Sequence, residues 1–257
     1  MNRHDADVGG ICLLTPKEMA QADEMAAKLG GCSYSLMQAA AAAVANQADA
    51  MAPSGPIAVL AGTGNNGGDA VLAAHYLRAR GRSVRLFMPG APKGDDAGRA
   101  MSEWASESES PEAFLPGEFA LVIDGLFGAG LQRPLDGAAA ELVRRLGEGN
   151  ARVLSIDLPS GVSGETGQVL GSAPQAEATV TFFRRKPGHL LQPGAALCGK
   201  VTVADIGIQA AVLHQIRPQT FANQPPLWRH RLLKPGEADH KYCLLYTSDA
   251  ADDSLRV

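Results

Sequence analysis

The fold is decided by the stretch Ile57-Ala58-Val59-Leu60-Ala61-Gly62-Thr63-Gly64-Asn65-Asn66-Gly67-Gly68-Asp69. Five apolar residues of strand length run directly into a glycine-rich turn, and a helical pattern over residues 69–80 follows. In parallel α/β sheets, such a turn lies at the carboxyl end of its strand, where ligands bind. The stretch therefore predicts an α/β fold with a ligand site at this turn.

The alternation of strands and helices continues on both sides of this stretch. A first helix begins near Thr15, which can form a capping box with Glu18. An alanine-rich helix follows at about 36–50, further helices are predicted at 94–106 and 136–146, and further strands at 83–88, 121–124, 153–157, 178–183 and 200–206. Because the strands are continuously apolar, helices are expected to cover both faces of the sheet. We predict a three-layer α/β/α, Rossmann-like domain with a mainly parallel sheet over residues 12–215.

The composition restricts the classes of function. The 257-residue chain is 46% hydrophobic, and its 23 basic and 27 acidic residues give a net charge of −4, which argues against a nucleic-acid partner. No stretch has the roughly 20 apolar residues of a membrane span, and residues 1–10 lack the apolar segment of a signal peptide. The four cysteines are scattered, so neither a zinc site nor a disulfide framework is expected. We expect a soluble, cytoplasmic protein that acts on a small molecule, without a membrane or nucleic-acid partner.

The first polar loop, residues 62–69, contains a G-x-G-x-x-G between a strand and a helix. In this context, backbone N–H groups can cradle phosphates. The next strand ends in Phe87-Met88-Pro89 and lacks the acidic residue that would hold an NAD ribose, which disfavours an NAD(P)-dependent oxidoreductase. A glycine-rich turn without a ligand remains the alternative for this loop.

Two further loops, residues 124–134 and 157–161, begin with a carboxylate directly after an apolar strand. The paired carboxylates of Asp124 and Asp157 could bind a cation or divide acid and base roles, although a single one often only caps a helix. Arg133 could face either a phosphate or solvent. The histidines, His189 among them, show no spacing that indicates a partner.

At these three loops the sequence resembles the YjeF N-terminal domain family, the NAD(P)H-hydrate epimerases. The family's motifs correspond here to residues 65–69, 124–134 and 157–161. The resemblance covers about residues 13–215. Ala129 and Leu158 replace the usual Thr and Ile conservatively, and Ser163-Gly164 stands where an Asp-Ala pair is common, which can alter the loop after Ser160.

The resemblance implies an activity and a site. The activity is epimerisation of the R and S forms of hydrated NADH and NADPH at carbon 6 of the nicotinamide ring, with the nucleotide as substrate. The resemblance also implies a potassium ion, K+, held by Asn66, Asp124 and Ser160. Substrate-binding residues implied in the same way are Asn65, Asn66, Gly67, Gly68, Asp69, Gly128, Ala129, Gly130, Leu131, Gln132, Arg133, Pro134 and Asp157.

Carbon 6 of such a substrate is a hemiaminal carbon, so an acid can help hydroxide to leave and water can return to the other face. We predict Asp157 as the acid and base, with Lys186 assisting it or neutralising phosphate. A surface lysine within the run Arg184-Arg185-Lys186 is an equally open interpretation. The alternative function is a non-catalytic nucleotide-binding or scaffold module of the same fold.

The C-terminal part of the chain differs in character. Residues 216–242, with Pro218, Pro225 and Pro226, indicate a linker followed by a segment that resembles the start of an ADP- or ATP-dependent NAD(P)H-hydrate dehydratase domain. The full-length protein is therefore expected to contain such a domain fused to this one. Residues 243–257 resemble the in-frame translation of a sequencing adapter, and we interpret them as a non-native tail, with an authentic polar tail as the alternative. The family resemblance is also compatible with a homodimer.

Overall fold

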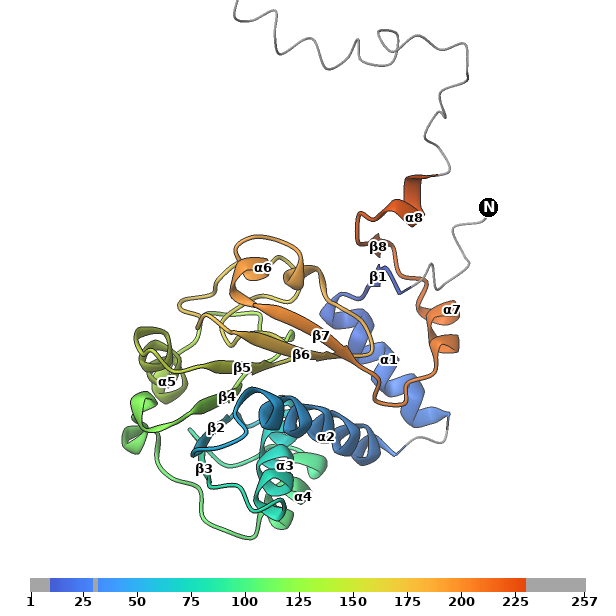
Figure 1. Ribbon diagram of the computed structural model, residues 1–257. Helices are drawn as coiled ribbons and strands as arrows, with labels where there is room; N and C mark the ends of the chain where they lie inside the picture. Colours follow the sequence, from blue (N-terminus) through green and yellow to red (C-terminus); the bar gives the residue numbers. More distant parts are fainter. Residues whose placement is uncertain (1–9, 30–31, 230–257) are drawn as a thin grey trace, which may run out of the picture. The chain divides into compact units, whose positions relative to one another are not determined.

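The structure is a computed structural model that describes residues 10–29 and 32–229, in two compact units, Met1–Ala222 and Asn223–Val257. The first unit contains a six-stranded sheet of order β3-β2-β4-β5-β6-β7, in which every neighbouring pair is parallel (Figure 1). The register pairs Leu60 with Asp124, and Asp124 with Ser155, so the ends of these strands lie together. The parallel sheet predicted from the sequence is confirmed, and its strands are β2 (Ile57–Ala61), β3 (Val84–Phe87), β4 (Leu121–Gly125), β5 (Val153–Ile156), β6 (Ala178–Phe182) and β7 (Lys200–Ala204).

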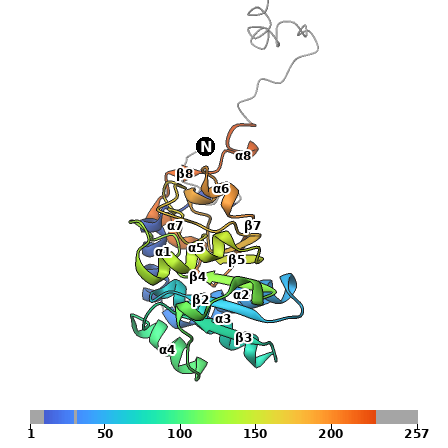
Figure 2. The same cartoon turned by 90° about the vertical axis from the view of Figure 1, so that its left-hand side faces the viewer.

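Helices cover both faces of this sheet (Figures 1 and 2). Ile57, Val59 and Ala61 of β2 pack into one apolar cluster with the first four helices. Ala58 and Leu60, which alternate with them, pack into a second cluster with the fifth helix. The three-layer α/β/α architecture is thus confirmed, with α1 (Pro16–Lys28), α2 (Ser33–Met51), α3 (Asn65–Ala79) and α4 (Asp95–Trp104) on one face and α5 (Gly137–Glu148) on the other.

The predicted capping box of α1 is present. The backbone N–H of Glu18 donates to Thr15 Oγ1 at 3.3 Å, and the backbone N–H of Thr15 donates to Glu18 Oε2 at 2.8 Å. These two bonds satisfy backbone donors that would otherwise be exposed at the start of the helix.

Helix α3 begins at Asn65, earlier than the start at Asp69 that the sequence predicts. Glycine is a poor helix former, which hides the first turn from a sequence-based prediction. Here tight packing compensates, since a Cβ on Gly67 would lie 1.8 Å from the carbonyl oxygen of Gly62. The glycine-rich loop and the N-terminus of α3 are consequently one structure.

A two-stranded antiparallel sheet pairs β1 (Cys12–Leu13) with β8 (Thr220–Phe221). The Ala222 N–H extends this pairing by donating to the Ile11 carbonyl at 2.8 Å. Residues 220–222 therefore pack on the first unit, although the sequence places them in the linker, because a two-residue strand in a proline-rich segment leaves no periodicity to detect. The remaining short elements of this unit are η1 (Pro111–Ala113), η2 (Pro116–Glu118), η3 (Pro187–His189), α6 (Gly194–Leu197), η4 (Ala210–Val212) and α7 (Leu213–Ile216).

The described part of the second unit is a single turn of helix, α8 (Pro225–Trp228). Within this unit, the indole N–H of Trp228 donates to Asn223 Oδ1 at 2.9 Å. The tail predicted at 243–257, and most of the segment that resembles a dehydratase domain, lie outside the described residues.

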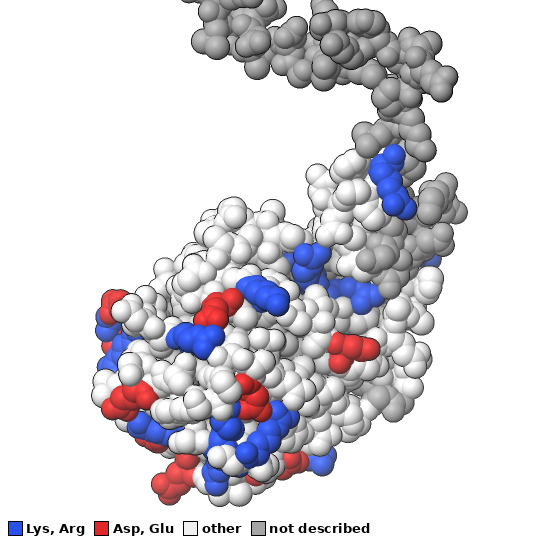
Figure 3. All heavy atoms as spheres, viewed as in Figure 1, with Lys and Arg blue, Asp and Glu red and all other residues white. Residues whose placement is uncertain are grey.

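The surface shown in Figure 3 carries basic and acidic side chains side by side. Several acidic and basic side chains form ion pairs, such as Arg85 with Glu109 at 2.6 Å. Within residues 10–29 and 32–229, none of the helices has the length and apolar character that crossing a membrane requires.

Candidate active site

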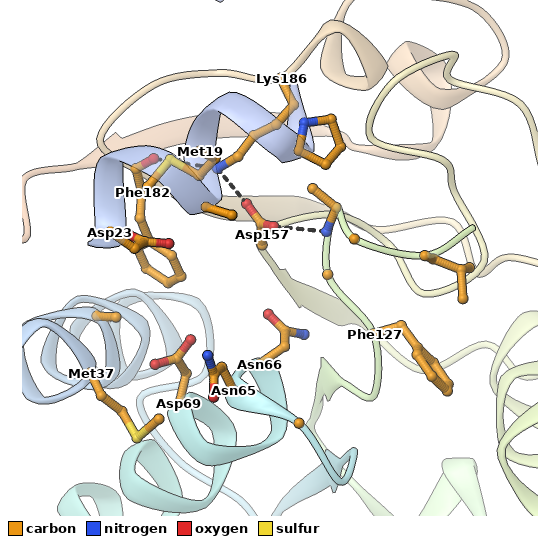
Figure 4. A pocket seen from close by; sticks show the side chains of 18 of the residues that line it. Met19, Asp23, Met37, Asn65, Asn66, Asp69, Phe127, Asp157, Phe182 and Lys186 are labelled. Atoms are coloured by element: carbon orange, nitrogen blue, oxygen red, sulfur yellow. Dashed lines mark hydrogen bonds and ion pairs between the residues drawn. The ribbon is translucent and has the colours of Figure 1, made fainter. Parts of the chain in front are cut away.

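A cavity of about 730 Å³ lies at the carboxyl ends of the central strands (Figure 4). The three loops singled out in the sequence meet here, together with residues from α1 and α2. Of the predicted substrate-binding residues, Gly67 and Gly68 are buried in α3 and Pro134 does not line the cavity. Those that line it are Asn65, Asn66, Asp69, Gly128, Ala129, Gly130, Leu131, Gln132, Arg133 and Asp157.

Asp157 directly follows β5 and extends into this cavity (Figure 4). Its backbone has a φ of +65°, in the left-handed region, where Asp and Asn are the commonest residues after glycine. Its Oδ2 accepts a hydrogen bond from the Ala129 N–H at 2.8 Å, which links the third loop to the second. Gly128 makes this approach possible, because a Cβ there would lie 2.9 Å from Asp157 Oδ2.

Lys186 is buried, with 1% of its surface exposed. Its ammonium group donates to Asp157 Oδ1 at 2.7 Å and to Thr181 Oγ1 at 2.9 Å. The interpretation of Lys186 as a surface lysine is therefore wrong. A run of basic residues gives no sign of which member turns inward, and here the turn after β6 directs Lys186 toward the end of β5.

These contacts fix the charge of Asp157. Burial alone would raise the pKa of this carboxyl, but the charge of the neighbouring Lys186 ammonium and the hydrogen bonds from Lys186 and Ala129 together outweigh it. The net effect lowers the pKa of Asp157 to about 2. At neutral pH the side chain is a carboxylate, and it can accept a proton.

His189 holds the backbone around the ion pair. Its Nδ1 accepts a hydrogen bond from the Lys186 N–H at 2.9 Å, and its Nε2 lies 2.6 Å from the carbonyl oxygen of Asp157. This pattern requires the neutral tautomer with the proton on Nε2, which donates to that carbonyl. Burial, with a contribution from the Lys186 charge, lowers the pKa of His189 to about 4 and keeps the ring neutral.

The predicted cation ligands surround the loop after β4. Asp124 and Ser160 are fully buried and in contact, with Ser160 Oγ donating to Asp124 Oδ1 at 2.5 Å and the Ser160 N–H donating to Asp124 Oδ2 at 2.8 Å. Asn66 approaches the same loop from α3, since a Cβ on Gly128 would lie 3.1 Å from Asn66 Oδ1. Burial raises the pKa of Asp124 against the hydrogen bonds that lower it.

These residues are suited to a weakly charged cation. All of their ligand atoms are oxygens, which hard cations prefer. Only one of these oxygens belongs to a charged group, the carboxylate of Asp124, and the others are neutral amide and hydroxyl oxygens, so the set suits a cation of low charge. Among the described residues, the Asn66 Nδ2 atom is buried without a hydrogen-bond partner, so this amide is not held in one orientation by the protein. No group of three or more His, Cys, Asp or Glu side chains that could hold a metal occurs in the part of the chain that the structure describes.

The sequence model of one family, described as the YjeF-related protein N-terminus, matches residues 33–188, more than half of the chain. The chain belongs to this YjeF N-terminal family. The match contains the three loops and ends beyond Lys186, so the family region includes the whole cavity except the part contributed by α1 and the segment after β7.

Similar proteins agree with this family membership. The NAD(P)H-hydrate epimerase of Bordetella pertussis (strain CS) is 43% identical over 186 residues, which cover 69% of this chain and 82% of that protein. The bifunctional NAD(P)H-hydrate repair enzyme Nnr of Thermofilum pendens is 38% identical over 219 residues, 79% of this chain. The chain spans only 41% of the length of that bifunctional relative. The crystal structure of the yeast protein ynu0 has the same fold, with a TM-score of 0.64 at 20% identity, over 74% of this chain and 86% of the yeast chain.

Two residues of the site, His189 and Asp23, are not predicted from the sequence. His189 has no partner nearby in the sequence, because its contacts are to backbone atoms. Asp23 lines the cavity from α1, and its position one turn after the buried Met19 is a signal that could have found it.

Replacing His189 by glutamine is expected to flatten the dependence of stability on pH. In the folded protein His189 has a pKa of about 4, whereas the ordinary value is 6.5. As the pH falls below about 6.5 the unfolded state takes up a proton that the folded state excludes, so stability is lost. We expect the free energy of unfolding to fall by about 2 kcal/mol more in the natural protein than in His189→Gln between about pH 7 and about pH 5.

Urea unfolding of both proteins at the two pH values measures this difference. Acids of the cavity whose pKa values are raised, Asp23 and Asp69, act in the opposite direction, but they are common to both proteins. Equal losses in the two proteins would contradict a neutral, buried His189.

Proposed function

We propose that this chain catalyses the epimerisation of the R and S forms of hydrated NADH and NADPH at carbon 6 of the nicotinamide ring. The observation that carries the proposal is the buried Lys186–Asp157 ion pair at the cavity, in a domain 43% identical to a protein named NAD(P)H-hydrate epimerase. A scaffold module of the same fold has no need of a carboxylate that is held ionised beside a cavity. The non-catalytic alternative is therefore less well supported.

The cavity offers separate surfaces for the parts of this nucleotide. The N-terminus of α3 and the backbone of the loop after β4 present N–H groups that suit the pyrophosphate, and Arg133 is an exposed cation beside them. The apolar side chains of Met19 and Phe182 line the part of the cavity near Asp157 and suit a ring, and Met37 lies beside Asp69 (Figure 4).

The chemistry begins from the hemiaminal at carbon 6. The lone pair of the ring nitrogen forms a carbon–nitrogen double bond as hydroxide leaves, and water then adds to the opposite face. Asp157, as a carboxylate, takes the proton from the entering water, while Lys186 holds it in place and balances its charge. General base catalysis of this kind contributes about 10²- to 10⁴-fold.

We propose Asn66, Asp124 and Ser160 as the residues that would hold a potassium ion. When bound, the ion would supply positive charge at the loop after β4, near the place proposed for the pyrophosphate. Asp124 already fixes Ser160 through two hydrogen bonds, so these two ligands are prepositioned.

Potassium is expected to stabilise the protein. In potassium chloride the melting temperature should exceed that in choline chloride at the same ionic strength by about 3 °C. Ser160→Ala should lose this difference, whatever its own melting temperature. Equal melting temperatures of the natural protein in the two salts would contradict the cation site.

The domain organisation is proposed as follows: an epimerase domain over 12–215, then a linker and the start of a fused dehydratase domain over 216–242. Its support is the bifunctional relative, whose name covers repair of the same hydrated nucleotides and of which this chain spans 41%. A homodimer and a cytoplasmic location stay predictions of the sequence.

The experiment that tests the proposed function uses chemically hydrated NADH. The two epimers are separated, one is incubated with the purified chain, and the epimer ratio is followed by chromatography. Conversion faster than in the absence of protein supports the function. Binding of the nucleotide without conversion would favour the non-catalytic alternative.

A further inference from the structure

Inversion at carbon 6 needs proton transfer on both faces of the ring. Hydroxide leaves from one face and must receive a proton there, whereas water enters on the other face and must give one up. Asp157 serves one face as a carboxylate. One carboxyl cannot serve both faces at once, and in the forward direction Asp157 acts as the carboxylate that its ion pair with Lys186, at 2.7 Å, favours. A second group is required.

Asp23 is an acid that lines the same cavity from a different element. It lines the cavity from α1, whereas Asp157 lines it from the end of β5 and Lys186 from the segment after β6. Figure 4 shows the Asp23 side chain on α1, close to Met19 and Phe182, and directed into the cavity. No described residue forms a hydrogen bond or ion pair with its carboxylate, so it has no structural partner within that part of the chain.

The surroundings of Asp23 also favour a proton. Asp23 is exposed to solvent at the open cavity, but the surrounding protein partly desolvates its carboxyl and raises its pKa to about 6, with the Lys186 charge opposing the shift and the Asp157 charge adding to it. Asp69 lines the same cavity from α3. Its pKa is itself raised by burial and by the negative charges of Asp157 and Asp23. Of the helices packed on α1, α2 carries Asp49, which is paired with Arg80 and Arg82, and α7 carries the exposed His214.

We propose that Asp23 is a second proton-transfer group of the reaction, acting on the face of the nicotinamide ring opposite Asp157. The inference rests on the proposed epimerase function. In the forward direction Asp23 gives its proton to the leaving hydroxyl as the carbon–oxygen bond breaks, and water departs. The nitrogen lone pair forms the double bond to carbon 6, a new water adds to the other face, the bonding pair returns to nitrogen, and Asp157 takes the water's proton.

The proton balance closes through solvent. One turnover leaves Asp157 protonated and Asp23 ionised, and exchange with water restores the starting state without an oxidant or reductant. In the reverse direction the two carboxyls exchange roles. An acid with a pKa close to the working pH is suited to this exchange, since it is populated in both forms.

The test compares four proteins: the natural chain, Asp23→Asn, Asp23→Glu and the control Glu24→Gln. Glu24 is the neighbouring acid on α1, exposed and paired with Lys28 at 2.7 Å outside the cavity. With hydrated NADH, Asp23→Asn is expected to lower kcat by about 10²-fold or more in both directions, with nucleotide binding changed by less than about 3-fold. Asp23→Glu should recover most of the rate, and Glu24→Gln should match the natural chain. Circular dichroism should show all four folded.

The dependence of the rate on pH separates proton transfer from a structural role. The natural chain should lose kcat as the pH rises above about 6, and Asp23→Asn should lack this limb. If the natural chain converts the epimers and Asp23→Asn does so at a similar rate, Asp23 is not a proton-transfer group. A loss of rate matched by an equal loss of binding, or an unchanged limb near pH 6, would overturn the proposal as well. Absence of conversion by the natural chain would instead contradict the proposed function itself.

Discussion

Replacing Asp157 by asparagine is expected to lower kcat for epimerisation by about 10³-fold or more while the nucleotide still binds. The substitution removes the charge and the proton-accepting ability but keeps the size of the side chain. It should not strain the backbone, because asparagine tolerates the φ of +65° found at this position. Rates from single-turnover assays and affinities from calorimetry measure the two effects separately.

A matched control is available at the edge of the sheet. Asp205 also follows a strand, β7, but it is exposed, lies outside the cavity, and accepts a hydrogen bond from the Gly207 N–H at 2.8 Å. Asparagine preserves that acceptor, so Asp205→Asn should behave as the natural protein. Full activity of Asp157→Asn would remove Asp157 from the mechanism.

Replacing Lys186 by methionine is expected to lower both activity and stability. The ammonium is the buried partner of Asp157, and its removal leaves a carboxylate in a poorly hydrated position. Breaking one side of a buried ion pair costs about 3 to 5 kcal/mol. Because the Lys186 charge is what holds the pKa of Asp157 low, that pKa should rise, and the activity should shift to higher pH.

A second substitution distinguishes the two effects. The double variant Lys186→Met with Asp157→Asn has no unpaired charge, so it should recover much of the lost stability but none of the activity. The control Arg185→Gln changes the neighbouring basic residue, which does not line the cavity. Additive stability losses in the double variant would contradict a direct coupling of Lys186 and Asp157.

The sheet and its active edge could be predicted from the sequence because their signals are local. Each strand is a continuous apolar run, and each predicted site loop follows one of these runs directly. Since parallel strands end at the same edge, Asn66, Asp124 and Asp157 could be placed together without knowledge of any distance. The family motifs then added the reaction and the roles.

Features that depend on contacts between distant segments could not be predicted. Lys186 and Asp157 are 29 positions apart, and no sequence rule shows that a lysine in a basic run turns inward to form an ion pair. His189 acts through backbone atoms, which every sequence contains. The early start of α3 depends on the fit of Gly67 against Gly62, which overrides the low helix propensity of glycine.

The most direct test of the central claim starts from one purified epimer of hydrated NADH. The unsubstituted chain should bring it to the equilibrium mixture of R and S forms well before the uncatalysed reaction does. The time course with Asp157→Asn should follow the one without protein. If the time course with the natural chain also coincides with that of the uncatalysed reaction, the chain is not an epimerase of this substrate.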